Sequence, residues 1–500
     1  MSNTLFQEEK DPSILNSPPS TVIEDDDDDS LIPQPSSLNL PLKDKDLPPI
    51  IREIVTNAPD SRKLPSFIAS LAPLCALATR LRLHYYYDSR PSALLLHVLI
   101  EGAQSSGKSY AADIEDLIMA ETLKARDKQQ RRLEQEYREK KKRRKANEKL
   151  EEEPKTTIRV IPATISKTVL TKRADFYERI LGDTLTFWMF AEELAQVTDA
   201  GKAAYSNLRT LMRTGWDLGS LFGLDFASDN SYSAIVDINI CCMFCTTPAA
   251  LDDYMDKKAI EGGNITRCVL CSLEDSLGSD GALFKPYTPE QRAVIQRILE
   301  LMMNDTYDAD GNLQPTKELD MSWIDKTVKK WCRKKGHQAS LTGSNALDVF
   351  RKRSSVSAFR IASLCYYLYL LEMGSTVPES QGSKSLNSQP STLNPSSLNR
   401  IRKLCLRIYE YMAEYILNSL LTRWGKKYED LNSKRAQDQL TTKKEDGLYF
   451  QLTDEFTRDQ LKLICQQQNL TTAPRQFIYL WQKSGDIIAI DKNHFKKVKI

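Results

Sequence analysis

Short apolar runs alternate with helix-like patterns through the middle of this chain. Apolar runs of strand length occupy 94–100, 157–161, 184–191, 235–245 and 267–273. Apolar residues at helical spacing lie between them, in 167–180, 194–213 and 248–258, and a polar stretch with hairpin character lies around 219–232. This alternation predicts an α/β fold in which helices cover both faces of a mainly parallel sheet.

Helical periodicity also precedes and follows this region. It predicts a helical lead-in at 47–87 and a helical bundle over 288–371 and 401–424, interrupted by a flexible Ser/Asn/Pro/Gln linker at 374–399. At the C-terminus, two helical stretches at 456–468 and 473–484 precede two strand-like runs at 487–490 and 495–500. That order is typical of a winged helix.

These patterns predict four parts of the chain. The tail (1–45) is rich in Ser, Pro, Asn and Asp and carries an acidic run at 24–29, so we expect it to be disordered and solvated. The other parts are a core with its lead-in (46–285) that contains a charged helical insert (124–153), a helical domain (286–430), and a winged-helix-like domain (450–500).

Composition narrows the class of protein. The chain has 500 residues, 41% of them apolar, and a net charge of +2, so any surface for nucleic acid must be local. No apolar run approaches the length of a membrane span, and the N-terminus does not resemble a signal peptide. We expect a soluble cytoplasmic protein whose ten cysteines are reduced thiols.

The clearest chemical motif lies directly after the first predicted core strand. Residues 102–109 spell G-x-x-x-x-G-K-S and are followed by a helical pattern. Gly102 and Gly107 let the loop close around a phosphate, Lys108 would reach the β- and γ-phosphates, and Ser109 would ligate Mg²⁺. A chance match in a turn would not need this strand and helix. We therefore predict ATP and Mg²⁺ as cofactors, with nucleotide contacts from Gly102, Ala103, Gln104, Ser105, Ser106, Gly107, Lys108, Ser109, Tyr110 and Thr246.

Hydrolysis needs acidic groups as well, and the strand at 184–191 ends in two. We assign Glu192 to the metal ion, through water, and Glu193 to the attacking water. An acid-rich helix start is the alternative interpretation. Thr246 or Thr247, at the tip of the strand 235–245, would bond the γ-phosphate or the water, although Thr-Pro also starts helices well.

Two arginines are candidates for sensing phosphate. Arg267 follows a Gly-Gly-Asn loop and directly precedes a strand, as an arginine finger reaching a neighbouring subunit would; a surface ion pair is the alternative. Arg360, on the later helix, is a candidate for a phosphate sensor in the same subunit. The Cys242/Cys245 and Cys268/Cys271 pairs have zinc-like spacing, but they lie in runs that read as buried strands, which favours core packing.

Basic residues cluster in two places. The insert carries a basic run at 138–145, which fits either a DNA-backbone contact or a solvated helix balanced by its own acids. In the winged-helix-like part, the side chains expected to face DNA are Arg475, Gln482, Lys483, Lys496, Lys497 and Lys499. A protein-contact module would have the same outline.

The combined motifs resemble an uncharacterised P-loop family of gut-bacterial mobile elements and prophages. The resemblance rests on I-E-G-A-Q-S-S-G-K-S-Y, F-A-E-E-L, T-T-P and G-G-N-I-T-R-C, and covers about 64–421. It implies a RecA/AAA-like ATPase core of helicase type, with a primase or another replication protein as partner. It supports the site residues Gly102, Gly107, Lys108, Ser109, Glu192, Glu193 and Arg267.

The sequence therefore predicts an ATP- and Mg²⁺-dependent helicase-like or DNA-remodelling motor. Single-stranded or forked DNA is the expected partner, and a trans arginine would imply a homo-oligomeric ring. The alternative is a nucleotide-dependent switch or adaptor that binds DNA or a replication partner and unwinds nothing.

Overall fold

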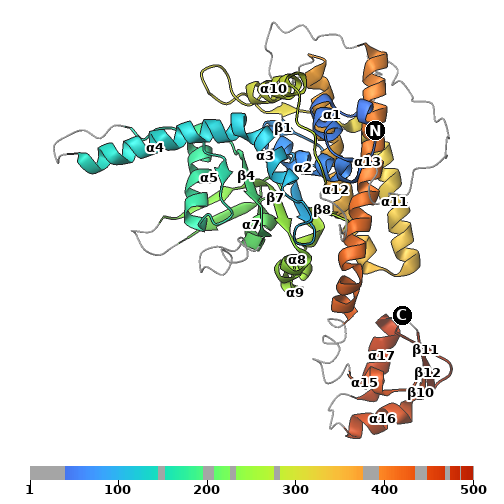
Figure 1. Ribbon diagram of the computed structural model, residues 1–500. Helices are drawn as coiled ribbons and strands as arrows, with labels where there is room; N and C mark the ends of the chain where they lie inside the picture. The colour runs from blue at the N-terminus through green and yellow to red at the C-terminus, as the bar shows by residue number, and fades with distance from the viewer. Residues whose placement is uncertain are drawn as a thin grey trace, which may run out of the picture.

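The computed structural model describes residues 40–144, 152–194, 208–225, 232–274, 282–374, 394–433, 447–467, 473–484 and 486–498 (Figure 1). The predictions for most of the tail and of the linker, and for Lys499, lie outside these ranges. Within them, no helix combines the length and the apolar character needed to cross a bilayer.

Five parallel strands form the central sheet, in the order β3-β4-β7-β2-β8. Their bounds are β2 (His97–Glu101), β3 (Val160–Ile161), β4 (Thr186–Ala191), β7 (Asn239–Thr246) and β8 (Cys268–Ser272). The α/β class and the parallel sheet are thus confirmed. The run predicted as one strand at 235–245 divides at Ile238 into β6 (Ala234–Asp237) and β7, and β6 pairs antiparallel with β5 (Leu221–Leu224).

Helices cover the two faces of the sheet because its strands are apolar on both sides. α2 (Asp60–Leu77) packs across β2, β4 and β7 and beside α3 (Tyr110–Met119). The opposite face carries α7 (Leu208–Thr214), α8 (Pro248–Tyr254) and α9 (Lys257–Glu261). All of these elements belong to one continuous apolar core.

Local signals define where several helices begin and end. Ser166 caps α5 (Lys167–Leu181) by accepting a hydrogen bond from the N–H of Val169, and Gly182 ends it with a φ of +66°. Thr288 and Gln291 form a capping box at the start of α10 (Pro289–Asn304). The first residues of α5 and α10 agree with those predicted from the sequence, because helix capping depends on residues that are neighbours in the chain.

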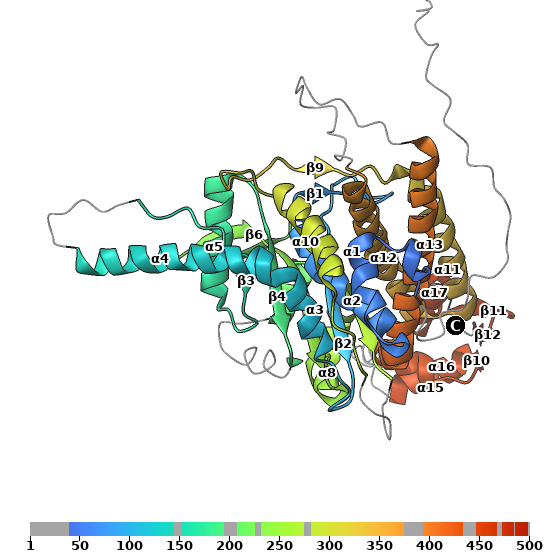
Figure 2. The same ribbon diagram turned by 45° about the horizontal axis from the view of Figure 1, so that its top comes forward.

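Long helices lie beside the sheet and share its core (Figure 2). They are α1 (Pro49–Thr56), α10, α11 (Asp325–Thr342), α12 (Asn345–Glu372) and α13 (Pro395–Leu420). α12 is buried along most of its length and packs against α11 and α13. A two-residue parallel pair, β1 (Leu81–Arg82) with β9 (Lys317–Glu318), links the lead-in to this part.

The charged insert forms a helix that extends away from the body of the molecule (Figure 1). α3 passes through a π-type turn at Ala120–Lys124 into α4 (Ala125–Arg143). Thr122 departs from helical geometry there, with φ −106° and ψ −105°. The sequence predicted this exposed helix between two strands, because its apolar residues are too sparse to form the apolar stripe of a coiled coil.

The C-terminal part has an apolar core of its own. It contains α15 (Gly447–Gln451), β10 (Glu455–Thr457), α16 (Arg458–Gln467), α17 (Pro474–Ser484), β11 (Ile487–Ala489) and β12 (His494–Lys497). The strands form an antiparallel sheet in the order β10-β12-β11. The sequence pattern placed a helix from 456, but β10 occupies that position and the helix begins at Arg458.

Candidate functional site

The carboxyl ends of four strands meet at one edge of the sheet. Glu101, the last residue of β2, lies opposite Thr246 of β7 and Ser272 of β8. Ala191, the last residue of β4, is paired with Phe244 of β7. Since all these strands are parallel, the loop after Glu101 and the acidic pair after Ala191 lie at the same edge.

The loop 102–109 curls back on itself at this edge. Gly107 has a φ of +73° and Ser105 a φ of +58°, both in the left-handed region. A Cβ on Gly102 would lie 2.4 Å from Oγ of Ser106 and 3.2 Å from Cδ1 of Leu273, so a larger residue would force these side chains to shift. The N–H of Gly102 donates to the carbonyl oxygen of Thr246 over 3.1 Å, which ties the start of the loop to β7.

Lys108 is directed into the curl of the loop. Its Nζ donates to the carbonyl oxygens of Gly102 (2.9 Å) and Ala103 (2.6 Å) and lies 3.4 Å from Oγ of Ser106. A cation satisfied by carbonyl oxygens can exchange them for the oxygens of an anion at the same place. The buried Arg62 of α2 donates to the carbonyl oxygen of Ser106 over 3.1 Å and supports the loop from beneath.

Glu192 and Glu193 follow β4 and are both exposed. Partial burial lowers the pKa of Lys108, while the charges of Cys245 and Glu193 act in the opposite direction. Burial raises the pKa of Cys245 to about 12, opposed by Lys108 and assisted by Glu192. β7 separates β2 from β4 by roughly 10 Å, about two strand spacings. The loop and the acidic pair therefore lie along the same edge of the sheet, on either side of the end of β7.

The other residues predicted to contact the nucleotide differ in the exposure of their side chains. Ala103, Gln104, Ser105 and Ser109 are exposed, and Ser106 is buried. The Tyr110 ring is buried in a stack on Phe284, with ring centroids 5.5 Å apart, so its side chain does not face the loop. The Thr246 hydroxyl is buried and donates to the carbonyl oxygen of Thr247.

Thr247 serves as a helix start. Its side chain accepts a hydrogen bond from the N–H of Ala250 and caps α8. This is the alternative that the sequence left open for the Thr-Pro pair. Thr246 is the residue of the two that remains at the strand edge beside the loop.

An ion-pair network beside the loop was not predicted. Arg423, in the π-type turn Leu421–Gly425 after α13, pairs with Glu101 through Nε (3.0 Å) and with Asp252 through a terminal nitrogen (3.0 Å). Ser272 also donates to Glu101, over 2.8 Å. No spacing in the sequence indicates this network, because Arg423 is 322 residues from Glu101.

Arg267 lies at the opposite, amino-terminal edge of the sheet, directly before β8. It donates to the carbonyl oxygen of Gly263 over 2.9 Å and lies 3.9 Å from Asp217. Burial and the nearby Arg353 lower the pKa of Arg267 to about 10, so it stays cationic at neutral pH. It cannot reach the loop of its own subunit, which lies beyond the length of β8, about 16 Å.

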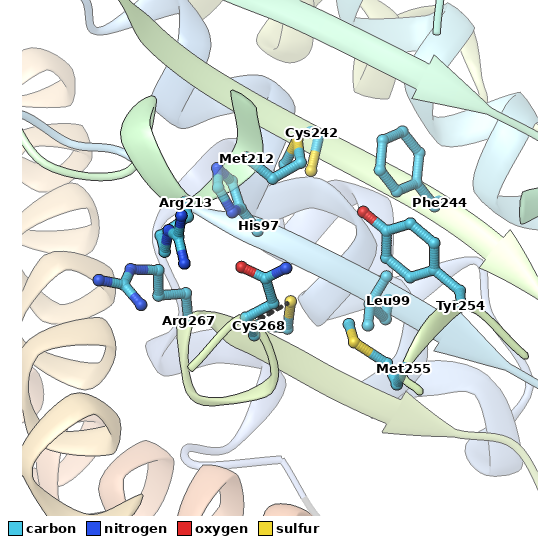
Figure 3. A pocket seen from close by; sticks show the side chains of 11 residues that line it. His97, Leu99, Met212, Arg213, Cys242, Phe244, Tyr254, Met255, Arg267 and Cys268 are labelled. Carbon is cyan, nitrogen blue, oxygen red and sulfur yellow. Dashed lines mark hydrogen bonds between the residues drawn. The ribbon is translucent and has the colours of Figure 1, made fainter. Parts of the chain in front are cut away.

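A small cavity of about 10 Å³ is lined by Arg267 and by side chains of β2, β7 and β8 (Figure 3). Arg213 and Arg267 lie at one end of it, and Phe244 and Tyr254 at the other (Figure 3). The volume suits one water molecule and is too small for a substrate. His97 lines the cavity and donates from Nε2 to the carbonyl oxygen of Ile240 over 3.1 Å. Burial lowers the pKa of His97 to about 3, so its ring is neutral.

Arg360 does not fit the role of a phosphate sensor in the same subunit. Its guanidinium is buried at the amino-terminal edge, where it donates to the carbonyl oxygens of Leu95 (2.9 Å) and Trp216 (3.1 Å). It also stacks on the Trp216 ring, 3.9 Å from the centroid. Helical periodicity placed Arg360 correctly in a helix but carried no information about which edge that helix faces.

Several C-terminal cations are already engaged. Lys496 pairs with Glu455 over 2.8 Å, and Lys497 donates to the carbonyl oxygen of Leu452 over 2.7 Å. Arg475, Gln482 and Lys483 are exposed on α17. Among the described residues that were predicted to face DNA, these three are therefore the ones on an exposed helix surface.

The cysteine pairs with zinc-like spacing lie on two different strands. Cys242 and Cys245 are in β7, Cys268 and Cys271 in β8, and β2 runs between them. All four thiols are buried, as core packing requires. Across the described ranges, no three His, Cys, Asp or Glu side chains gather as a metal site. A Mg²⁺ ion at the loop would depend on Ser109, Glu192 and the phosphates of a nucleotide, which is how this ion is commonly held.

No protein-family model and no curated protein sequence matches this chain. Among solved structures, the chain is similar to one described as "SCCmec type IV Cch - active helicase". The TM-score is 0.21 and the identity 8%, over 87% of this chain and 67% of that one. A similarity of this strength does not define a fold, so the α/β class rests on the strand order itself.

Proposed function

We propose that this chain is a Mg²⁺-dependent P-loop ATPase that acts on DNA in a helicase-like or remodelling role. The observation that carries the proposal is that Lys108, inside a curled glycine loop, and Glu193, after the end of another strand, lie at the same edge of the parallel sheet. A lysine and a carboxylate at the carboxyl edge of a parallel sheet are the two halves that ATP hydrolysis needs.

The strand order supports the RecA/AAA-like assignment. β7 lies between the loop strand β2 and the acidic strand β4, which leaves space at the edge for a phosphate chain and a water molecule. Thr246, at the tip of the intervening strand, borders that space. The loop also passes a steric test, since Gly102 and Gly107 occupy positions that larger residues would close or strain.

Each residue has a separate task in this proposal. Lys108 would exchange two carbonyl contacts for phosphate oxygens, and Ser109 and Glu192 would hold the metal ion. Glu193 would orient the attacking water and accept its proton. Bound MgATP supplies the transferable phosphoryl group and a partly neutralised charge. Arg267, at the far edge, would serve the site of a neighbouring subunit in a homo-oligomeric ring.

DNA as the partner is supported by the sequence resemblance and by two exposed regions. One is the basic end of α4, and the other is the helix–helix–hairpin order of the C-terminal part, which supports the winged-helix interpretation. A primase or replication protein would join the same assembly.

A second candidate is a nucleotide-dependent switch or adaptor. One observation favours it: the C-terminal part exposes Tyr479, Leu480, Ile488 and Ile490, each by more than half of its surface. Exposed apolar side chains at this density suit a protein partner. The adaptor would bind ATP and DNA without displacing a strand.

The test is ATP turnover with and without single-stranded DNA. Lys108→Ala should abolish nucleotide binding, and Glu193→Gln should bind nucleotide but lose turnover by roughly a hundredfold or more. Glu300→Gln, on the exposed face of α10, is the control and should match the wild type. Turnover unaffected by both site variants would overturn the proposal. Binding without turnover, and without strand displacement, would select the adaptor.

A further inference from the structure

We propose that the outer half of α4, together with the cavity between α4 and α5, binds a single strand of nucleic acid. This inference rests on the proposed function, in which DNA is the partner, and it names the surface that DNA would use. The surface joins a dense set of cations to a hollow lined by aromatic rings. Proteins that bind single strands commonly use this combination, because the cations follow the backbone and the rings stack on bases.

The cations lie at the exposed end of the helix. Residues 138–144 contain six basic side chains and one acid, Glu139, and all seven are exposed. Glu139 pairs with Arg143 over 3.9 Å. The helix extends away from the body of the molecule at this end, and no other described helix or strand covers its exposed cations (Figure 1). A local excess of positive charge is sufficient for phosphate contacts even though the whole chain is nearly neutral.

The cavity lies at the inner end of the same basic stretch. It has a volume of about 280 Å³ and lies between α4 and α5. Six of its lining residues are Glu134, Tyr137 and Arg138 from α4, and Lys172, Arg173 and Phe176 from α5. Tyr137 and Phe176 are half-buried, which leaves part of each ring facing the hollow. A cavity with aromatic rings beside the basic residues favours a nucleic-acid contact over a merely solvated helix as the interpretation of the insert.

The charges inside the cavity are arranged in favour of an anion. Glu134 pairs with Arg173, over 3.0 and 3.3 Å, and with Arg138, over 3.4 Å, and it accepts a hydrogen bond from the hydroxyl of Thr156. The lining thus holds three cations, Arg138, Lys172 and Arg173, against two acids, Glu134 and Glu153, and Lys172 is exposed. Lys172 lies 5.0 Å from the Tyr232 ring centroid, which keeps its ammonium group at the surface.

Helix geometry places the ring and the cations on one stripe. Lys141 follows Tyr137 by four residues, and Lys142 follows Arg138 by four, so each pair lies on the same side of α4. A strand whose base enters the cavity against Tyr137 would therefore continue along Lys141 and Lys142. Duplex DNA cannot do this, because its bases are stacked inside the helix.

The base of α4 is connected to the proposed ATP site. Lys124, at the turn between α3 and α4, pairs with Glu115 (2.5 Å) and Asp116 (3.2 Å) of the helix that follows the loop. Asp127, one turn further, accepts hydrogen bonds from the N–H groups of Arg159 and Val160 at the start of β3. A strand held by α4 would thus be connected to the loop helix through the π-type turn at Ala120–Lys124 and these polar contacts.

The experiment measures binding of a labelled 30-nucleotide oligo(dT) by fluorescence anisotropy, without nucleotide and at several salt concentrations. The arm variant carries Lys141→Gln, Lys142→Gln and Arg144→Gln. Its matched control carries Lys330→Gln, Arg333→Gln and Lys334→Gln on α11, which removes the same charges from another exposed helix surface. We expect the arm variant to bind roughly tenfold to a hundredfold more weakly at about 0.1 M salt, with a salt slope shallower by about 2. The control should bind like the wild type.

The cavity is tested by a second pair of variants. Tyr137→Leu should weaken oligo(dT) binding by about fivefold or more because it removes the stacking ring, and Tyr137→Phe should leave it unchanged. Equal losses in the arm and control variants, or no loss in the arm variant, would overturn the proposal. A 30-base-pair duplex that binds as tightly as oligo(dT), or normal binding by Tyr137→Leu, would overturn the single-strand assignment. Since the binding assay contains no ATP, its result can be interpreted even if the chain shows no ATPase activity.

Discussion

Trp188 donates a hydrogen bond from its indole Nε1 to Oε1 of Glu115 over 2.9 Å, and both side chains are buried. Glu115 belongs to α3, the helix that follows the glycine loop, and Trp188 belongs to β4, the strand that ends at Glu192 and Glu193. The two halves of the proposed ATP site are therefore joined beneath the surface by one polar contact.

Trp188→Phe should destabilise the fold by about 1–3 kcal/mol more than the same change at a buried tryptophan without such a bond. The reason is that Glu115 would keep its buried position and lose a donor. Trp424→Phe is the control, because Trp424 is buried and its indole N–H has no hydrogen-bond partner among the described residues. Denaturant unfolding measures both variants. Equal losses would show that the contact contributes no net stability.

Arg423→Gln should cost roughly 1–2 kcal/mol of unfolding free energy, since it leaves the buried Glu101 carboxylate without its cation. Lys427→Gln provides the comparison: its Nζ lies 3.9 Å from Asp252 and is more exposed, so its loss should be close to zero. Thermal unfolding of the two variants measures the loss of stability in each. A loss for Lys427→Gln as large as that for Arg423→Gln would contradict the assigned role of Arg423.

Gly102→Ala should abolish or greatly weaken nucleotide binding, because its Cβ would meet Ser106 Oγ and force the loop open at a cost of about 1–3 kcal/mol. Titration with a fluorescent ATP analogue measures the effect. Gly343→Ala is the control: it replaces a glycine of positive φ, +64°, in open space at the end of α11, away from the loop. It should lose some stability and bind nucleotide normally. Normal binding by Gly102→Ala would mean that the loop does not hold the nucleotide.

Arg267→Ala should bind ATP but fail to hydrolyse it, because its guanidinium would act on the site of a neighbouring subunit. Mixing this variant with Lys108→Ala should restore part of the turnover, since some interfaces then combine an intact loop with an intact arginine. Arg209→Ala is the control: it removes an arginine of α7 that pairs with Asp256, and it should keep its ATPase activity. Only monomer in size-exclusion chromatography with ATP, or no recovery on mixing, would remove Arg267 from the mechanism.

His97 should make the fold less stable in acid. Burial lowers the pKa of His97 to about 3, below its ordinary value near 6.5, so the folded state binds its proton only at lower pH than the unfolded state does. Its contribution is fully present above pH 6.5 and is lost as pH falls towards 3, at up to roughly 1 kcal/mol per pH unit. His97→Gln should flatten the measured slope between pH 6 and 4. His337→Gln, on the exposed side of α11, should retain it.

The glycine loop, its strand and its helix were predictable because they depend on neighbours. Gly102, Gly107 and Lys108 have the spacing that closes a loop, and the apolar run before them has the length of a buried strand. The exposed charged helix α4, which occupies Ala125–Arg143 of the insert predicted at 124–153, was predictable in the same way, since its sparse apolar residues cannot form a buried face. The acidic pair at 192–193 could be placed at a strand end by the same local argument.

The strand order, the edges and the partners of distant side chains were decided only by the tertiary structure. The insertion of β7 between β2 and β4, the arrival of Arg423 at Glu101, and the burial of Arg360 at the opposite edge join residues that are far apart in the chain. Lys496 and Lys497, predicted to face DNA, are engaged by groups of a strand and a turn that lie before them. Periodicity in a sequence specifies which face of an element is apolar, but pairing and docking depend on long-range contacts that leave no mark in local spacing.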